Sequence, residues 1–188
     1  IPETIREPYC LMTTASADAP LKGLAVLLRA IASLRSSYPD IRLTLVGRPK
    51  PGGDTEKLIA SLGLGDVVES SKGISHEEMV QKYASASVAV VPSIYEGFGL
   101  PAVEAMACGV PLVSTDGGAL AEVVADAGLV VPAGDSEALA AAIHQLFEDD
   151  QLRDDYASRG LSRAEQHFCW NRCAERMETY YRERIAAC

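Results

Sequence analysis

The 188-residue chain carries 26 Asp and Glu residues against 17 Lys and Arg, for a formal net charge of −9. This acidic balance argues against a nucleic-acid partner and against a polybasic membrane-binding patch. Hydrophobic residues make up 48% of the chain and charged residues 23%, proportions typical of one globular domain that is large enough to bury a core.

No apolar run approaches the roughly 20 residues that span a bilayer, and the first residues lack the pattern of a signal peptide. The chain begins with Ile1 rather than Met, which indicates a fragment of a longer protein. Five cysteines without CxxC spacing read as reduced thiols, so we expect a cytoplasmic protein. Cys169 and Cys173 lie one helical turn apart, but without a nearby His or further Cys they predict no metal site.

Short apolar segments alternate with amphipathic ones through residue 131. The pattern predicts strands at residues 9–13, 42–46, 67–69, 88–91, 111–114 and 129–131. It predicts helices at residues 22–36, 55–62, 75–84 and 119–125, with one more after Pro101. Ser75 and Glu78 have the spacing of a capping box at the start of the third helix. Alternating strands and helices with right-handed crossovers predict an α/β fold with a doubly wound, Rossmann-like parallel sheet.

The last third of the chain is helical, without further strands. Asp135 is expected to cap a helix that runs to residue 147, and two more helices are expected at residues 151–166 and 171–187. These helices have the composition of packing elements. The three histidines, His76, His144 and His167, are expected at the surface or in helix caps, and no Ser/His/Asp or Cys/His arrangement stands out.

In a doubly wound sheet, ligands bind beyond the carboxyl ends of the strands. The loops expected there are residues 14–21, 47–54, 70–74, 92–100 and 114–118, and most of them are rich in Gly, Ser or Thr. This composition fits contact with a polar ligand, although ordinary turns of α/β proteins share it.

The segment 90–108, VVPSIYEGFGLPAVEAMAC, joins a buried strand to a helix through a loop that contains Gly97 and Gly99. The glycines allow positive φ or the close approach of a ligand, and Pro101 suits the first turn of a helix. The free N–H groups at this helix start predict a site for phosphate or the polar face of a sugar. Glu96 and Glu104 flank the loop. A buried turn whose two glutamates are merely solvated is the alternative interpretation.

The string E-G-F-G-L-P-x-x-E-A-M-A-x-G-x-P, followed by D-G-G-x-x-x-E, closely resembles the donor-side motif of the family 4 (group 1) retaining glycosyltransferases of GT-B fold. The resemblance extends from about residue 9 to residue 180. It implies that residues 1–188 form the C-terminal, nucleotide-sugar-binding domain, and that the acceptor-binding N-terminal domain is absent from this chain. In the resembling family a final helix, marked here by Phe168 and Trp170, crosses back toward that other domain.

The resemblance also implies a role for each motif residue. Glu104 would hold the ribose hydroxyls, Glu96 would lie beside the transferred sugar, and Lys22 would pair with the diphosphate and stabilise its developing charge. The turn that ends at Ile74 would lie against the nucleobase. The remaining donor contacts would come from the backbone of Gly97, Phe98, Gly99, Leu100, Gly117 and Gly118.

One departure from the family pattern concerns the diphosphate. The family usually has an Arg five positions before the Lys, and this chain has Ala17 there. A diphosphate carries at least two negative charges, so Lys22 alone would leave one poorly matched. Arg48 and Lys50 follow the strand at residues 42–46, on a loop that should open at the same edge of the sheet. Our hypothesis is that one of them supplies the second cation.

The sequence thus predicts a hexosyl-type glycosyltransferase donor domain that transfers sugar from a UDP-, GDP- or ADP-sugar with retention and without a cofactor. No Asp-x-Asp metal motif occurs, so no essential metal is expected. The acceptor, a glycan, lipid or small molecule, would bind the missing domain, as would any peripheral contact with the inner membrane face. Two alternatives remain: an epimerase or phosphorylase of the same fold, and a non-catalytic nucleotide-sugar sensor. A response-regulator receiver is disfavoured because no acidic pair follows the first strand.

Overall fold

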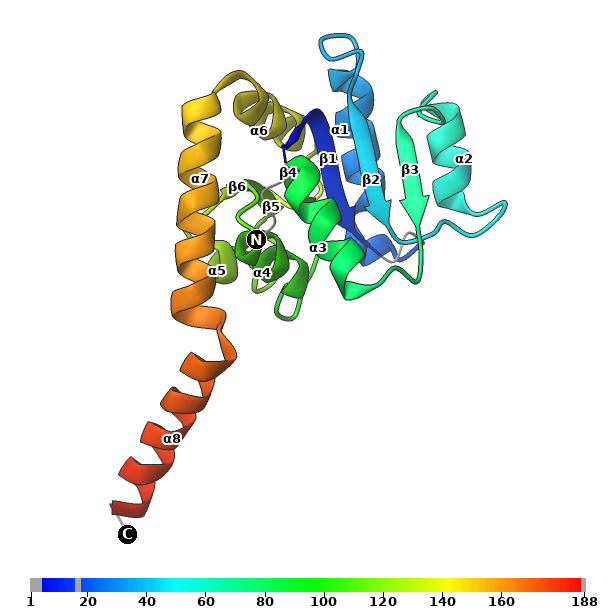
Figure 1. Ribbon diagram of the computed structural model, residues 1–188. Coiled ribbons are helices and arrows are strands. Elements are labelled where there is room, and N and C mark those ends of the chain that lie inside the picture. Colours follow the sequence, from blue (N-terminus) through cyan, green and yellow to red (C-terminus); the bar gives the residue numbers. More distant parts are fainter. Residues whose placement is uncertain (1–4, 16–17, 187–188) are drawn as a thin grey trace.

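The computed structural model describes residues 5–15 and 18–186, and it forms a six-stranded parallel sheet flanked by helices (Figure 1). The strand order is β3-β2-β1-β4-β5-β6, which is the Rossmann order. The strands are β1 (Glu7–Thr14), β2 (Arg42–Val46), β3 (Val68–Ser71), β4 (Ala86–Val91), β5 (Leu112–Thr115) and β6 (Leu129–Val131). The predicted doubly wound α/β fold is confirmed, and each predicted strand lies within two residues of its observed bounds.

Helices cover both faces of the sheet. They are α1 (Leu24–Leu34), α2 (Asp54–Ser61), α3 (His76–Ser85), α4 (Leu100–Ala107), α5 (Leu120–Val124), α6 (Ser136–Glu148), α7 (Asp150–Arg163) and α8 (Trp170–Ala186). The predicted capping box is present, since Ser75 accepts a hydrogen bond from the amide of Glu78 and the Glu78 carboxylate accepts one from the amide of Ser75. Asp135 caps α6 as predicted. All three histidines are exposed.

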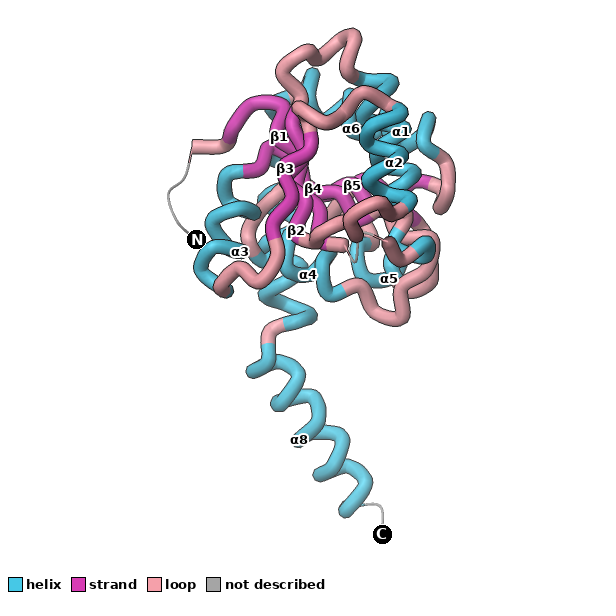
Figure 2. The backbone as a smooth tube through the Cα atoms, turned by 90° about the vertical axis from the view of Figure 1, so that its right-hand side faces the viewer, coloured by secondary structure: helices cyan, strands magenta, loops and turns pink. Residues whose placement is uncertain are grey.

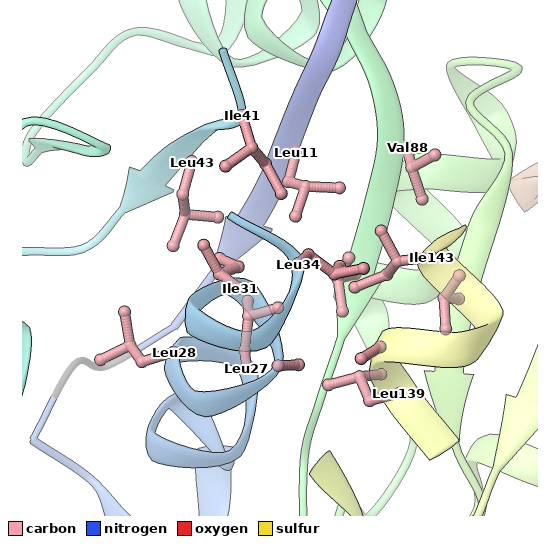
Figure 3. Close-up of a cluster of buried hydrophobic side chains, with 14 of the residues drawn as sticks. Leu11, Leu27, Leu28, Ile31, Leu34, Ile41, Leu43, Val88, Leu139 and Ile143 are labelled. Atoms are coloured by element: carbon pink, nitrogen blue, oxygen red, sulfur yellow. The ribbon is translucent and has the colours of Figure 1, made fainter. Parts of the chain in front are cut away.

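Two apolar clusters fill the space between the sheet and its helices. The first, on the side of α1 and α6, includes Leu27, Ile31, Leu43 and Ile143, and Figure 3 shows these side chains converging between the strands and the two helices. The second lies on the opposite face, where α3, α4 and α5 pack against the sheet. β4 lies between the clusters and is buried at each of its six residues, which explains its continuous apolar sequence.

The helix predicted at residues 22–36 was wrong at its start. A three-residue 3₁₀ turn, η1 (Pro20–Lys22), comes first, and α1 begins only after Gly23, whose φ is 64°. A Cβ at Gly23 would lie 1.8 Å from the carbonyl oxygen of Pro92. The break therefore lets the chain after β1 approach the backbone of the loop after β4 more closely than a side chain would allow.

The C-terminal helices also differ from the prediction. The helix expected at residues 151–166 ends at Arg163 and continues as a π-helical segment, η2 (Ala164–Phe168), so Phe168 precedes the last helix instead of belonging to it. The following helix, α8, buries none of its residues and extends away from the body (Figures 1 and 2). Within the described ranges, no helix is both long and apolar enough to cross a membrane.

Candidate functional site

The carboxyl ends of β1 and β4 form the point where the order of the sheet reverses. The loops that follow these two neighbouring strands lead to opposite faces of the sheet, and such a point is the usual ligand crevice of an open α/β fold. Here the two loops are joined, because the amide of Ile94 donates to the carbonyl of Leu21 at 2.8 Å. The site is therefore built from η1 on one side and from the loop between β4 and α4 on the other.

Lys22 and Glu96 meet across this point. The Nζ atom of Lys22 lies 2.6 Å from Oε1 of Glu96, and the hydroxyl of Ser93 donates to the same oxygen at 2.9 Å. The Glu96 side chain is only 11% exposed, whereas that of Lys22 is 34% exposed. Glu96 is therefore a fixed, largely desolvated carboxylate, and Lys22 is the partner with more freedom to turn toward solvent or a ligand.

The backbone of Glu96 is held by the turn after β5. Its amide donates to the carbonyl of Gly117 at 3.3 Å, and its carbonyl accepts from the amide of Ala119 at 2.9 Å. A Cβ at Gly117 would lie 2.6 Å from the carbonyl oxygens of Ser93 and Ile94, and Gly118 has a φ of 67°. Gly117 and Gly118 therefore lie against the loop that contains Glu96, and the absence of side chains at these two positions allows the two backbones to come close together.

The start of α4 presents unpaired amides to the site. The N–H groups of Gly97, Phe98, Gly99 and Leu100 donate to no acceptor within the described residues. Gly99 has a φ of 95°, and a Cβ there would lie 2.6 Å from Cδ2 of Leu120. Gly97 is not left-handed, and a Cβ there would meet nothing within 4 Å. Positive φ therefore explains Gly99 but not Gly97, while both residues contribute to an anion-attracting helix start.

Glu104 lies on α4, one helical turn beyond Leu100. The hydroxyl of Tyr83, from α3, is 3.4 Å from Oε2 of Glu104 and 3.4 Å from the carbonyl oxygen of Pro101. Glu104 is an exposed residue, yet partial burial of its carboxyl raises the pKa of Glu104, against the opposing effect of the Tyr83 hydroxyl. The carboxylate is therefore incompletely compensated, which suits a group that accepts hydrogen bonds from a ligand.

A cleft of about 730 Å³ opens at the carboxyl ends of β1, β2 and β3. Its lining contains four basic residues, namely Lys22, Arg48, Lys50 and Lys72. Asp18 also lines the cleft, but its carboxylate accepts a hydrogen bond from the amide of Lys50 at 2.7 Å, and this bond lowers the pKa of Asp18. The hydroxyl of Ser71, another lining residue, has no hydrogen-bond partner in the described part of the chain. The cleft is suited to an anionic, polar ligand.

The structure brings most of the predicted site residues to this edge of the sheet. Lys22 and Arg48 line one cleft, and Lys22 contacts Glu96 directly. Ile74 is not part of the cleft lining, although its neighbours Lys72 and Gly73 are. Ala17 lies outside the described residues.

Sequence reasoning missed several polar residues of the site. Ser93 stands three residues before Glu96, a spacing that allows the observed contact, but Tyr83 gave no signal because it is a buried residue of an amphipathic helix. Asp18 likewise gave no signal. Within residues 5–15 and 18–186, no group of three or more His, Cys, Asp or Glu side chains is placed to hold a metal ion.

Comparison with known proteins extends these observations. The family of Glycosyl transferases group 1 matches residues 3–163. The chain is 45% identical to the MMP alpha-(1->4)-mannosyltransferase of Mycolicibacterium hassiacum over 185 residues, which are 95% of this chain and 44% of that protein.

Solved structures agree. Sucrose-phosphate synthase from Thermosynechococcus elongatus superposes with a TM-score of 0.82 at 34% identity, over 97% of this chain and 46% of that one. The Anabaena protein HepE in complex with UDP superposes with a TM-score of 0.80 at 26% identity, over 96% of this chain and 49% of that one. The chain therefore spans less than half the length of each of these proteins, and its Rossmann-like sheet corresponds to one domain of a GT-B glycosyltransferase. By its motif, its fold and these similarities, the chain belongs to the family of group 1 glycosyl transferases.

Proposed function

We propose that this chain is the donor-binding domain of a retaining glycosyltransferase that moves a hexose-like sugar from a nucleoside diphosphate sugar to a hydroxyl acceptor. Family membership supports the reaction class, and the complex of a similar protein with UDP supports a nucleotide in the donor. Acceptor contacts would come from a part of the protein outside residues 1–188, since the chain spans 44% of its mannosyltransferase relative.

The ion pair between Lys22 and Glu96 carries this proposal. In transfer, the bond between the anomeric carbon and the diphosphate breaks and the diphosphate leaves with the bonding electrons. The acceptor hydroxyl oxygen forms the new bond to the anomeric carbon and gives its proton to the departing diphosphate. Lys22, whose side chain is more exposed than that of Glu96, would leave Glu96 for the diphosphate, where its charge would stabilise the leaving group. Glu96 would keep its hydrogen bond from Ser93. Having lost the ion pair with Lys22, its carboxylate could accept hydrogen bonds from the sugar.

Arg48 is proposed as the second diphosphate cation. It lies at the carboxyl end of β2, and it lines the same cleft as Lys22. Lys50 lines this cleft too, but its backbone is tied to Asp18, whose negative charge lies next to it. Within the described residues, the Arg48 guanidinium makes no hydrogen bond or ion pair, and a guanidinium can bind two phosphate oxygens at once. We therefore favour Arg48 over Lys50 for this role.

The nucleoside would be held by Glu104 and by the turn at Lys72 and Gly73. A carboxylate accepts hydrogen bonds from two vicinal hydroxyls, which is the arrangement that a ribose offers. The free amides of residues 97–100 would then face the sugar and the adjoining phosphate. With two cations and a helix start on the diphosphate, the proposed reaction requires no metal ion.

Calorimetry of the 188-residue chain against UDP, GDP and ADP, and then against their sugar conjugates, tests the donor-site assignment. We expect one nucleotide to bind and Lys22→Ala to weaken it, while Lys57→Ala on α2 serves as a matched control that leaves binding unchanged. If none of the three nucleotides binds, the proposal is overturned.

Measuring the products that the full-length protein forms distinguishes a glycosyltransferase from a sensor, an epimerase or a phosphorylase. We expect the full-length protein to transfer sugar and this chain alone to bind without transferring, because GT-B chemistry needs a second domain to exclude water and to position the acceptor. Binding without transfer by the full-length protein would favour the nucleotide-sugar sensor. Interconversion of the donor sugar, or phosphorolysis with a pyridoxal absorption band, would favour an epimerase or a phosphorylase.

A further inference from the structure

Phe98, in the loop before α4, touches a residue from the far end of the chain. Its ring and that of Phe168, the last residue of η2, have centroids 5.8 Å apart and planes at 84°, an edge-to-face contact. Such contacts between aromatic rings add stability beyond the area that they bury. The loop with the free amides is therefore connected to the segment that joins α7 to α8.

Phe168 is fixed from its other side. The guanidinium of Arg163 lies 5.8 Å from the Phe168 ring centroid. The same guanidinium donates to the carbonyls at the end of α5, at 2.7 Å to Val123 and 2.7 Å to Glu122. Phe168 also packs against the apolar cluster that includes α4. Its ring is thus an anchor that the body of the domain holds in place.

The loop around Phe98 is held by backbone hydrogen bonds at its two ends, Glu96 and Gly99, and less firmly between them. Phe98 is 47% exposed, and it stands between Gly97 and Gly99, which have no side chains to pack. None of the amides from residue 97 to residue 100 donates to an acceptor in the described ranges. Among the described residues, the edge-to-face contact with Phe168 is the ring contact that Phe98 makes. Phe168 is therefore placed to influence the orientation of the amides next to Phe98.

We propose that Phe168 is a positioning residue for the donor sugar, which acts through the ring of Phe98 to hold the amides of residues 97–100 in place. This inference rests on the proposed function, because it assumes that these amides face the sugar. It also makes a narrower claim, since the ring contact acts on the loop before α4, whereas Glu104 is positioned within α4 and beside the Tyr83 hydroxyl. Loss of the Phe168 ring should therefore weaken binding of a nucleotide sugar more than binding of the nucleotide alone.

The test compares Phe168→Leu, Phe98→Leu and the double variant with the parent chain, by calorimetry with GDP against GDP-mannose, UDP against UDP-glucose and ADP against ADP-glucose. For the pair that binds, each single variant should lose about two- to tenfold more affinity for the nucleotide sugar than for the nucleotide. The double variant should lose no more than either single variant, because both remove one contact. Phe168→Tyr should restore the parent ratio. Tyr181→Leu on α8 removes an aromatic ring away from the loop and should leave the ratio unchanged.

Thermal unfolding checks that each variant folds, and Phe98→Leu covers the case in which Phe168→Leu does not, since about half of Phe98 is exposed. If the parent binds and the variants lose equally for both ligands, lose nothing, or lose additively in the double variant, the inference is wrong while the proposed function stands. If the parent binds none of the six ligands, the proposed function fails and the inference fails with it.

Discussion

Replacing Glu104 with Gln should change binding and stability in opposite directions. Burial raises the pKa of Glu104, so the folded state binds this proton more tightly than the unfolded state does. Protonation of Glu104 therefore stabilises the folded state. This stabilisation is fully present below the pKa of Glu104 in the unfolded chain, and it is lost as the pH rises through the pKa of Glu104 in the folded chain. At pH 7 the ionised carboxylate therefore costs stability, and Glu104→Gln should leave the free energy of unfolding unchanged or slightly higher.

For nucleotide binding, the same substitution should be harmful. Hydrogen bonds to a charged group contribute about 1.5–3 kcal/mol. Glu104 is partly open to solvent, so the lower part of that range applies, about 1.5–2 kcal/mol, which corresponds to an affinity loss of about ten- to thirtyfold. A 2′-deoxynucleotide should lose affinity for the parent chain and lose little more with Glu104→Gln.

Calorimetry measures the binding, and urea denaturation monitored by circular dichroism measures the stability. Glu183→Gln, which removes an equal charge from exposed α8, is the matched control and should alter neither. Equal 2′-deoxy penalties in the parent and in Glu104→Gln would separate Glu104 from the ribose. A marked fall in stability at pH 7 would refute the reasoning about its desolvation.

The other predictions concern pH, the glycines and the cations. Nucleotide affinity should fall as the pH is lowered through the raised pKa of Glu104, because a protonated carboxyl accepts hydrogen bonds poorly; in a calorimetric titration series, Glu104→Gln should lack this component, and identical profiles would contradict the assignment. Gly23→Ala should lower the urea-unfolding free energy by more than about 1 kcal/mol, because its φ is 64° and its Cβ would meet a backbone carbonyl. Gly97→Ala should not lower that free energy, and equal effects of the two substitutions would refute the steric argument. In a double-mutant cycle on diphosphate affinity, Lys22→Ala and Arg48→Ala should each weaken binding and should couple; no change with Arg48→Ala would remove it from the site.

The layers of the fold were predictable because local patterns determine them. Buried parallel strands are apolar throughout, as in β4, and amphipathic helices show their inner face in the sequence. The break at Gly23 was not predictable, since its cause is the carbonyl of Pro92, far along the chain. The π-helical end of α7 was missed for a related reason: its sequence continues a helical pattern, and only packing around Phe168 distinguishes it.

The sequence predicted which residues belong to the site, but it did not predict which of them contact one another. The motif identified Glu96 and Lys22, but no local pattern shows that they form an ion pair, because this depends on β1 and β4 being neighbours in the sheet. Tyr83 was missed because a buried aromatic residue on a helix reads as core, and its hydroxyl becomes informative only when Glu104 lies beside it. Local sequence patterns predict the strands but not their order in the sheet, and the contacts between site residues depend on that order.

Because α8 has no buried residue, its stability has a different origin from that of the packed body of the domain. The body unfolds as a packed core, whereas the 17 residues of α8 bury nothing and depend on helix–coil equilibrium. The ion pairs along α8, Arg172 with Glu175 and Arg182 with Glu178, contribute only about 0.2–0.5 kcal/mol each. Most of the stability of a helix in a protein comes from packing of its apolar face, and α8 has no buried residue. Unless another surface covers its exposed Trp170 and Ile185, the amides of α8 should exchange with solvent deuterium far faster than those of β4, with the boundary between fast and slow exchange near Cys169.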